Sequence, residues 1–284
     1  MPQRQISVST VAYDGYPIAT AFEEISKIGL RLVEPAFIKG YMIFDEADFS
    51  ETAAINMRHM LSRFDLSAVA ISAHMDNGLP DSGEMLARRI RYTAEIGARF
   101  TITNSSTVDR RADLNRVLET NLRLAEELGV IIALENPGNG PTNIMRDGKS
   151  GAELVRSFNS PSLRLNYDTA NALTCTEGQT RPETDIDEAL PVLAHAHLKD
   201  VVQREGRWHY VAIGAGELDY DVLLKKLSVR ADVPLTLELP LRLKRRFHAE
   251  PERGAELPAI ADIAASLRAS WNCVTQAFVD VKSV

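Results

Sequence analysis

Four apolar, strand-like segments of the chain carry, at or near their carboxyl ends, a side chain that can bind a cation or transfer a proton. These side chains are Glu135, Asp168, His197 and Glu238, each separated from the next by about one strand and one helix. Three carboxylates brought together without a partner would repel one another, and at least one would have to bind a proton. A divalent cation removes that conflict, so the residue types themselves indicate a metal site.

The donor set also narrows the choice of ion. Three carboxylates and one imidazole form a hard set of oxygen and nitrogen donors, which suits Mn²⁺ or Mg²⁺ and tolerates Co²⁺ or Zn²⁺. The chain has only two cysteines, Cys175 and Cys273, which are too few for a thiolate zinc cluster or a disulfide framework. Any metal must therefore be held by His, Asp and Glu.

Each of the four residues also has a purely structural explanation. An acidic residue that ends a strand is often a helix N-cap or an ion-pair partner, and a single strand histidine is usually a hydrogen-bonded core residue. This explanation is weaker for four such residues at the same depth on consecutive strands. The metal site is the favoured interpretation.

The elements that must position these residues alternate regularly along the chain. The segments predicted as strands are Gln5–Ser9, Leu32–Pro35, Ala68–Ser72, Phe100–Thr103, Val130–Leu134, Leu163–Tyr167, Ala194–Leu198 and Leu235–Leu239. The segments predicted as helices are Ile18–Ile28, Ser82–Ile96, Leu114–Leu128, Gly151–Phe158, Ile186–Leu193 and Tyr220–Val229, with Leu257–Phe278 as a closing helix before a tail. This pattern predicts an α/β fold, one (β/α)8 TIM barrel over residues 1–284, with catalytic residues at the carboxyl ends of the strands.

An open, doubly wound sheet is the alternative fold. Such a sheet usually has fewer strands and often a glycine-rich first turn, whereas the first strand here runs into Val11–Gly15, which has only one glycine.

The composition excludes several classes of protein. The formal net charge is −7, from 32 Lys and Arg against 39 Asp and Glu, which argues against a nucleic-acid binder. The first ten residues lack a secretion signal, and no apolar run approaches the ~18 residues that span a bilayer. We therefore expect a cytoplasmic protein with neither a membrane nor a nucleic acid as partner, and homo-oligomer formation stays open.

The motifs ALENPG, NYDTAN, HAHLKD and LTLELP, which contain the four candidate ligands, resemble the sugar-phosphate isomerase/epimerase family with a xylose-isomerase-like barrel. Ketose 3-epimerases, hydroxypyruvate isomerases and inosose dehydratases also belong to this group. The resemblance covers nearly the whole chain, including Leu32–Glu34 and Gly214–Tyr220. It implies that Glu135, Asp168, His197 and Glu238 bind a metal, with Mn²⁺ the expected ion. It also implies that the two glutamates are an acid/base pair and that the substrate is a small carbohydrate.

The chain departs from the epimerase pattern in two places. Asn171 stands where the epimerases carry a histidine three residues after the aspartate of the sixth strand. Their substrate-binding arginine after the seventh strand has no clear equivalent, because Lys199 and Arg204 are both candidates. These departures argue against a standard ketohexose epimerase.

The expected barrel places Glu135 and Glu238 about 135° apart around its axis. Such a pair suits removal of a proton from one face of a carbon and delivery to another face or position. A metal would stabilise the enediolate formed in between. We therefore expect a metal-dependent sugar isomerase or epimerase. A dehydratase on the same centre is the alternative, because loss of a β-hydroxyl can follow the same first step. A binding subunit without activity is a third reading, which retention of all four ligands disfavours.

Four further polar residues are candidates for substrate binding. They are His74, Asn104, Asn171 and Lys199, all at or beyond strand ends. Each has a structural alternative: a core imidazole for His74, the start of the next helix for Asn171, and an ion pair with Asp200 or Glu217 for Lys199. Two loops, Gly138–Gly140 and Gly214–Gly216, match no nucleotide-binding fingerprint and are interpreted as turns.

Two other features leave the substrate open. The basic run Arg242–Arg246 could attract an anionic substrate or a partner subunit, although a solvated loop is the favoured interpretation.

A phosphodiesterase like endonuclease IV shares the barrel but uses a trinuclear, histidine-rich zinc centre. The chain has six histidines in all, and it carries Asn171 and Arg207 where that family needs ligands. DNA repair is therefore disfavoured.

Overall fold

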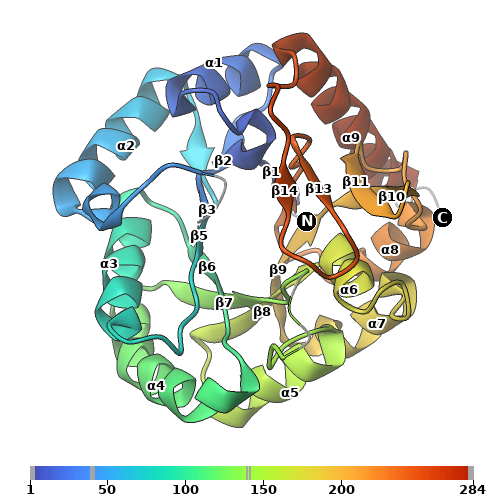
Figure 1. Ribbon diagram of the computed structural model, residues 1–284. Helices are drawn as coiled ribbons and strands as arrows, with labels where there is room; N and C mark the ends of the chain where they lie inside the picture. The colour runs from blue at the N-terminus through green and yellow to red at the C-terminus, as the bar shows by residue number, and fades with distance from the viewer. Residues whose placement is uncertain (1–3, 39–41, 139, 141, 281–284) are drawn as a thin grey trace.

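The computed structural model describes residues 4–38, 42–138, 140 and 142–280, and in them parallel strands form a closed barrel surrounded by helices (Figure 1). The eight barrel positions are filled by β1 (Ile6–Ser9), β2 and β3 (Leu32–Glu34 and Ala36–Ile38), β4 and β5 (Ser67–Ala68 and Ala70–His74), β6 (Phe100–Asn104), β7 (Ile131–Glu135), β8 (Leu163–Asp168), β9 (Leu193–Leu198) and β12 (Leu235–Leu237). The predicted α/β barrel is confirmed, and each predicted strand overlaps one of these positions.

The barrel closes through its second and third positions, which are each split into two short strands. Pro35 has no N–H to donate and separates β2 from β3, while Val69 separates β4 from β5. β1 pairs with both β12 and β2, β2 pairs with β4, and β3 pairs with β5, all in parallel. The sheet therefore has no open edge between its first and last positions.

Helices cover the outside of the barrel. They are α1 (Ile18–Lys27), α2 (Glu51–Arg63), α3 (Ser82–Glu95), α4 (Arg111–Glu127), α5 (Gly148–Phe158), α6 (Thr169–Cys175), α7 (Pro182–Ala189), α8 (Tyr220–Leu227) and α9 (Ile260–Asp280). The sequence did not predict α2 or α6. α6 is short and buried along its whole length, so it shows no amphipathic period. No helix of the described chain is long and apolar enough to cross a membrane.

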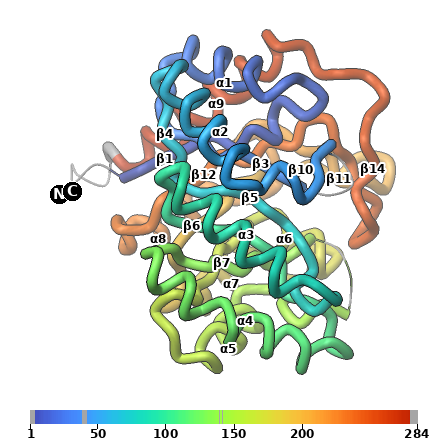
Figure 2. The backbone as a smooth tube through the Cα atoms, turned by 90° about the vertical axis from the view of Figure 1, so that its left-hand side faces the viewer, coloured from blue at the N-terminus to red at the C-terminus, as the bar shows by residue number. Residues whose placement is uncertain are grey.

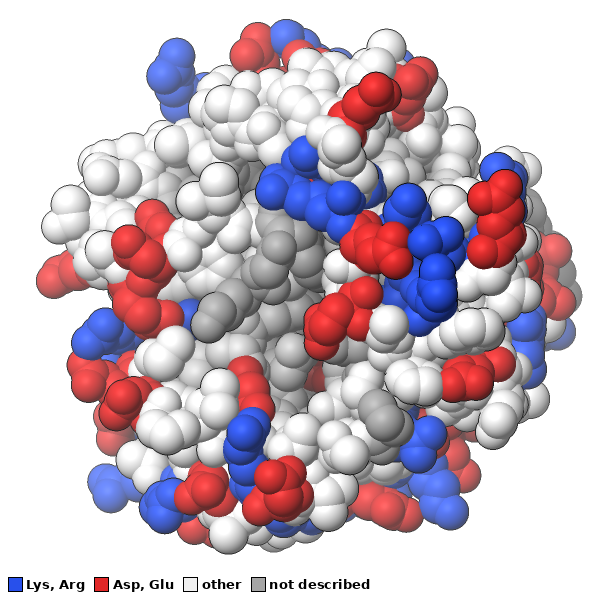
Figure 3. All heavy atoms as spheres, viewed as in Figure 1, with Lys and Arg blue, Asp and Glu red and all other residues white. Residues whose placement is uncertain are grey.

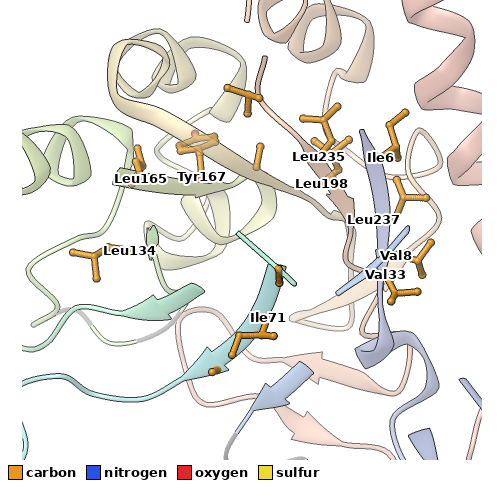
Figure 4. Close-up of a cluster of buried hydrophobic side chains, with 14 of the residues drawn as sticks. Ile6, Val8, Val33, Ile71, Leu134, Leu165, Tyr167, Leu198, Leu235 and Leu237 are labelled. Carbon is orange, nitrogen blue, oxygen red and sulfur yellow. The ribbon is translucent and has the colours of Figure 1, made fainter. Parts of the chain in front are cut away.

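Side chains alternate along each barrel strand. Those that face the helices are apolar, and on several strands those that face the barrel interior are polar. The buried apolar cluster of Figure 4 includes Val8, Val33, Leu198 and Leu237. The alternate positions of the same strands carry polar groups, and Ser7 Oγ lies 2.6 Å from Thr236 Oγ1 across the β1–β12 pair. The barrel interior therefore combines a separate apolar cluster, which includes Phe100, Ile102 and Ala133, with buried polar groups that can orient the charged side chains near the carboxyl ends of the strands.

A second sheet, which the sequence analysis did not predict, lies beyond the carboxyl ends of the barrel strands. It is antiparallel and contains β10 (Asp200–Arg204), β11 (Arg207–Val211), β13 (Leu243–Arg245) and β14 (Glu252–Arg253). Figure 2 shows β10, β11 and β14 at one end of the barrel. The turn between β10 and β11 is Glu205-Gly206, both with positive φ, as a two-residue hairpin requires. Glutamate is an uncommon residue there, so the hairpin signal in the sequence is weak.

Asp200 ties this second sheet to the loop before α8. Its Oδ2 accepts hydrogen bonds from the N–H groups of Gly214 and Gly216, and its Oδ1 accepts from Val201 and Leu218. A side chain on Gly216 would overlap this carboxylate. The interpretation of Gly214–Gly216 as a turn agrees with this geometry.

We predict that Asp200→Asn lowers the free energy of unfolding by about 1–3 kcal/mol, because an amide NH₂ in place of Oδ2 leaves the N–H groups of Gly214 and Gly216 without this acceptor. Chemical denaturation monitored by circular dichroism measures the change. Asp65→Asn is the matched control, since Asp65 forms only a surface ion pair with Arg31 and should change stability by about 0.5 kcal/mol or less. Equal stability of the two variants would contradict the role of Asp200.

Candidate metal centre

The four side chains predicted as metal ligands lie together at the carboxyl end of the barrel. Glu135 ends β7, Asp168 ends β8, His197 lies on β9 and Glu238 directly follows β12. One ligand atom from each lies within 4.8 Å of those of the other three, and all four residues are buried. Asp168 is also the N-cap of α6, where its carboxylate accepts a hydrogen bond from the Asn171 N–H. The N-cap alternative is thus correct for Asp168 without removing it from the cluster.

His197 lies at the centre of the cluster and contacts carboxylates through both ring nitrogens. Its Nδ1 lies 2.9 Å from Glu135 Oε2, 2.8 Å from Glu238 Oε2 and 4.0 Å from Asp168 Oδ2. Its Nε2 lies 3.0 and 3.1 Å from the two oxygens of Glu34. Burial alone would lower the pKa of His197, but Glu34, Glu238 and Glu135 raise it well above its ordinary value.

The pKa values of the three carboxyl groups show that the cluster favours positive charge nearby. Burial raises the pKa of Asp168 to about 7, against the opposing effect of Lys199. Burial also acts to raise the pKa of Glu238, but Lys199 and His197 lower it to about 2. Glu135 is likewise buried, and His197 and His74 hold its pKa well below the usual range. One carboxyl group of the three is therefore close to binding a proton at neutral pH, as expected for crowded acids.

Lys199 places its ammonium group directly on this cluster. Its Nζ lies 2.7 Å from Asp168 Oδ2 and 2.9 Å from Glu238 Oε2, and its side chain is 7% exposed. Its partners are thus two candidate metal ligands, and not Asp200 or Glu217. Although burial acts to lower the pKa of Lys199, Asp168 and Glu238 raise it well above its ordinary value.

The residues of the cluster fit a divalent cation. Three carboxylates and one imidazole nitrogen converge, and the buried atoms Asp168 Oδ2 and Glu238 Oε2 have ion-pair partners but accept no hydrogen bond from the described part of the chain. A hard cation would be stabilised by these oxygens in a site shielded from water. Because Lys199 approaches the same two oxygens, cation binding requires its ammonium group to shift toward the adjoining cavity.

Glu34 is a part of the site to which the sequence analysis gave no role. Ser72 Oγ and Thr236 Oγ1 donate hydrogen bonds to it at 2.5 and 3.0 Å, and it faces Nε2 of His197. A carboxylate that accepts from one ring nitrogen of a histidine leaves the other nitrogen as the metal donor. The signal in the sequence was an acidic residue at the end of the second strand, where an ion pair is the ordinary interpretation.

His74 and Asn171 both contact Glu135. His74 Nε2 lies 3.3 Å from Glu135 Oε2, and Asn171 Nδ2 donates to Glu135 Oε1 at 3.0 Å. Burial alone would lower the pKa of His74, but the charge of Glu135 raises it above its ordinary value. Asn104 lies opposite Glu135 in the β6–β7 pairing, and its backbone carbonyl accepts from Asn77 Nδ2. His74 and Asn171 thus position the Glu135 carboxylate, while the Asn104 side chain forms no hydrogen bond with the four clustered residues in the described part of the chain.

A cavity of about 680 Å³ opens beside the cluster. It is lined by all four residues predicted to bind substrate, namely His74, Asn104, Asn171 and Lys199, together with Glu135 and Glu238. The second sheet supplies Tyr210 and Arg245 to its wall, and the loop after β7 supplies Gly138. Asn139 of the predicted glycine loop lies outside the described residues. The volume suits a small molecule, which would lie against the carboxylates of Glu135 and Glu238.

Comparison with known proteins agrees with this arrangement. The chain matches the family described as xylose isomerase-like TIM barrel over residues 22–265. A ketose 3-epimerase of Arthrobacter globiformis is 23% identical over 247 residues, which are 81% of this chain and 80% of that protein.

Two solved structures show the same fold. One is a D-tagatose 3-epimerase-like protein, with a TM-score of 0.72 at 16% identity, covering 98% of this chain and 99% of that one. The other is a probable 3-DHS dehydratase of Bacillus anthracis, with a TM-score of 0.66 at 15% identity, covering 93% of this chain and 97% of that one.

We predict that Glu34→Gln weakens Mn²⁺ binding by about 10- to 100-fold, because the histidine loses the carboxylate that fixes its proton and orientation. Isothermal titration of the folded protein with Mn²⁺ measures the affinity, and Glu23→Gln is the matched control with a half-exposed side chain. If Glu34→Gln does not fold, Thr236→Val removes one of the hydrogen bonds to Glu34, together with the contacts to Ser7 and His195, and should weaken binding less because His197 keeps its carboxylate partner. Unchanged affinity in folded variants would contradict this role.

Proposed function

The chain belongs to the xylose isomerase-like TIM barrel family, and we propose that it is a divalent-metal-dependent isomerase or epimerase of a small sugar or keto-sugar. One observation carries the proposal. Two buried carboxylates, Glu135 and Glu238, contact the same nitrogen of His197 and line the same cavity. The ketose 3-epimerase relative supports the same class of reaction.

In this proposal Glu135, Asp168, His197 and Glu238 hold the ion, and Mn²⁺ is expected, with Mg²⁺, Co²⁺ and Zn²⁺ compatible with the same donors. The bound cation would polarise the substrate carbonyl and stabilise negative charge on the neighbouring oxygen. Asp168 and His197 serve only to hold it, since Asp168 is fixed as the cap of α6 and His197 is fixed by Glu34.

Glu135 and Glu238 carry out the proton transfers. They come from the fifth and eighth barrel positions and so approach a bound molecule from different sides. One carboxylate takes the proton from the carbon beside the carbonyl and leaves an enediolate, and the other glutamate, after taking a proton from water, or water itself, returns a proton to the opposite face or to the neighbouring carbon. Oε2 of Glu135 faces His197, and its Oε1 accepts from Asn171, so its two oxygens have different environments.

The polar side chains around the cavity would bind the hydroxyl groups of the substrate. His74 and Asn171 contact Glu135 and can exchange one hydrogen bond for a substrate oxygen. Asn104 also lines the cavity, and Lys199 offers an ammonium group beside Glu238. Asn171 replaces the epimerase histidine at this position and is held by its contact with Glu135.

A dehydratase of an inosose or keto-sugar is the second candidate function, and Lys199 favours it. The ammonium group lies 2.9 Å from Glu238 Oε2 and faces the cavity. It could donate a hydrogen bond to a β-hydroxyl as that group leaves, once Glu135 has removed the α-proton. The first step is the same in both functions, so the fate of the enediolate distinguishes them.

We predict that the Mn²⁺-loaded protein exchanges an α-hydrogen of at least one member of a panel of ketoses, keto-acids and inososes in D₂O. Glu135→Gln and Glu238→Gln should each lower this exchange by about 10²- to 10⁴-fold, because each removes a proton-transfer group. Proton NMR of the substrate measures exchange, and EDTA should abolish it. Glu153→Gln, on the exposed face of α5, is the matched control.

The products separate the candidate functions. Exchange without loss of water indicates an isomerase or epimerase, and loss of water indicates a dehydratase. Full exchange in both glutamine variants would contradict the acid/base assignment. Silence on the whole panel, together with a lack of divalent-ion affinity, would favour a binding subunit without activity.

A further inference from the structure

Arg245 is a buried cation in the wall of the cavity, and no acidic residue of the described part of the chain forms an ion pair with it. It ends β13, its residue is 6% exposed, and it lines the cavity together with Lys199 and Asn171. Its Nε and Nη1 atoms have no hydrogen-bond partner within the described part of the chain. A buried charge is costly unless its polar atoms have partners, so two N–H groups of a guanidinium without a partner in a cavity wall point to an anion that comes from outside the chain.

The surrounding chain holds the guanidinium in place without neutralising it. The backbone of Arg245 pairs with Trp208 of β11, which fixes the residue in the second sheet. A Cβ on Gly138 would overlap Arg245 Nη1 and would also lie 2.5 Å from Asn171 Oδ1. The absence of a side chain at Gly138 therefore leaves the space that the guanidinium occupies beside Asn171.

The other described basic residues of the run Arg242–Arg246 do not have this position. Arg242 donates to the carbonyl oxygen of Gly254 and lies 3.7 Å from Asp14, and Lys244 lies 4.0 Å from Glu252. Arg246 is exposed. Figure 3 shows Lys and Arg side chains beside the central hollow, on the side where Figure 1 places β13 and β14, with Asp and Glu side chains among them. Arg245 therefore differs from its neighbours by its burial in the cavity wall.

We propose that Arg245 is an oxyanion-binding residue, and that the natural substrate carries a carboxylate or phosphate group that contacts it. A planar guanidinium matches either group through paired N–H donors. Arg245 has two N–H donors without a hydrogen-bond partner in the described part of the chain, and it lines this cavity. This inference rests on the proposed function for the reaction, but anion binding is measurable without turnover.

The binding experiment uses the Mn²⁺-loaded full-length protein at constant ionic strength. Inorganic phosphate and acetate are titrated separately by isothermal calorimetry into the wild type, Arg245→Gln and the matched control Arg246→Gln, one position along the same run. The wild type and Arg246→Gln should bind at least one of these anions, and Arg245→Gln should bind it about 10- to 100-fold more weakly. Stronger binding of phosphate indicates a sugar phosphate, and stronger binding of acetate indicates a sugar acid.

A second measurement separates binding from a structural role. Without added oxyanions, Arg245→Gln should have a Tm equal to or above that of the wild type, because it removes a buried charge that has no partner. Arg245→Lys keeps the charge and should retain part of the affinity. Equal anion affinity in Arg245→Gln and Arg246→Gln, or absence of anion binding by the wild type, would overturn the proposal.

Turnover gives an independent readout. If the exchange reaction is found, the ratio of kcat/KM for an anionic sugar to that for its neutral counterpart should fall about 10- to 100-fold in Arg245→Gln and stay constant in Arg246→Gln. An unchanged ratio in Arg245→Gln would overturn the proposal. Silence in the exchange assay with Arg245-dependent anion binding would contradict the proposed function while supporting the subsite.

Discussion

Three carboxylates held out of water around one imidazole are the constraint on which the rest of the site depends. Glu135, Asp168 and Glu238 lie close to His197 and therefore close to one another. Their negative charges repel, which favours positive charge between them. Within the chain, the ammonium group of Lys199 supplies positive charge, and the raised pKa of His197 favours its protonated form. A divalent cation would stabilise the carboxylates more strongly, because one ion can contact all four donors at once.

The barrel keeps these charged side chains close together, because polar residues in its interior hold them through hydrogen bonds. Alternation along the strands directs Ser72, Thr236 and Glu34 into the interior, where their hydrogen bonds hold the Glu34 carboxylate against His197. The parallel register then places His197 level with Asp168 and Thr236 on the neighbouring strands. Breaking one hydrogen bond in this layer therefore affects the geometry of the metal cluster above it.

Much of this arrangement could be predicted from the sequence, because it depends on local pattern. Alternating apolar runs and helical segments predicted the barrel, and the polar residue at each strand end predicted which side chains converge. The confirmed barrel brings Glu135, Asp168, His197 and Glu238 together as expected. Their roles in binding and proton transfer stay predictions.

The contacts that the sequence did not predict join residues whose local patterns do not show that they meet. Glu34 contacts His197 across 163 positions, and Lys199 turns to Asp168 and Glu238, not to the nearby Asp200. The position of Arg245 depends on the pairing of β13 with β11, which the local sequence pattern did not predict.

The most direct measurement of the central claim is anomalous diffraction from a crystal grown with Mn²⁺. We predict a peak coordinated by Glu135, Asp168, His197 Nδ1 and Glu238, with Lys199 displaced from Asp168; a peak elsewhere, with that ion pair intact, would contradict it.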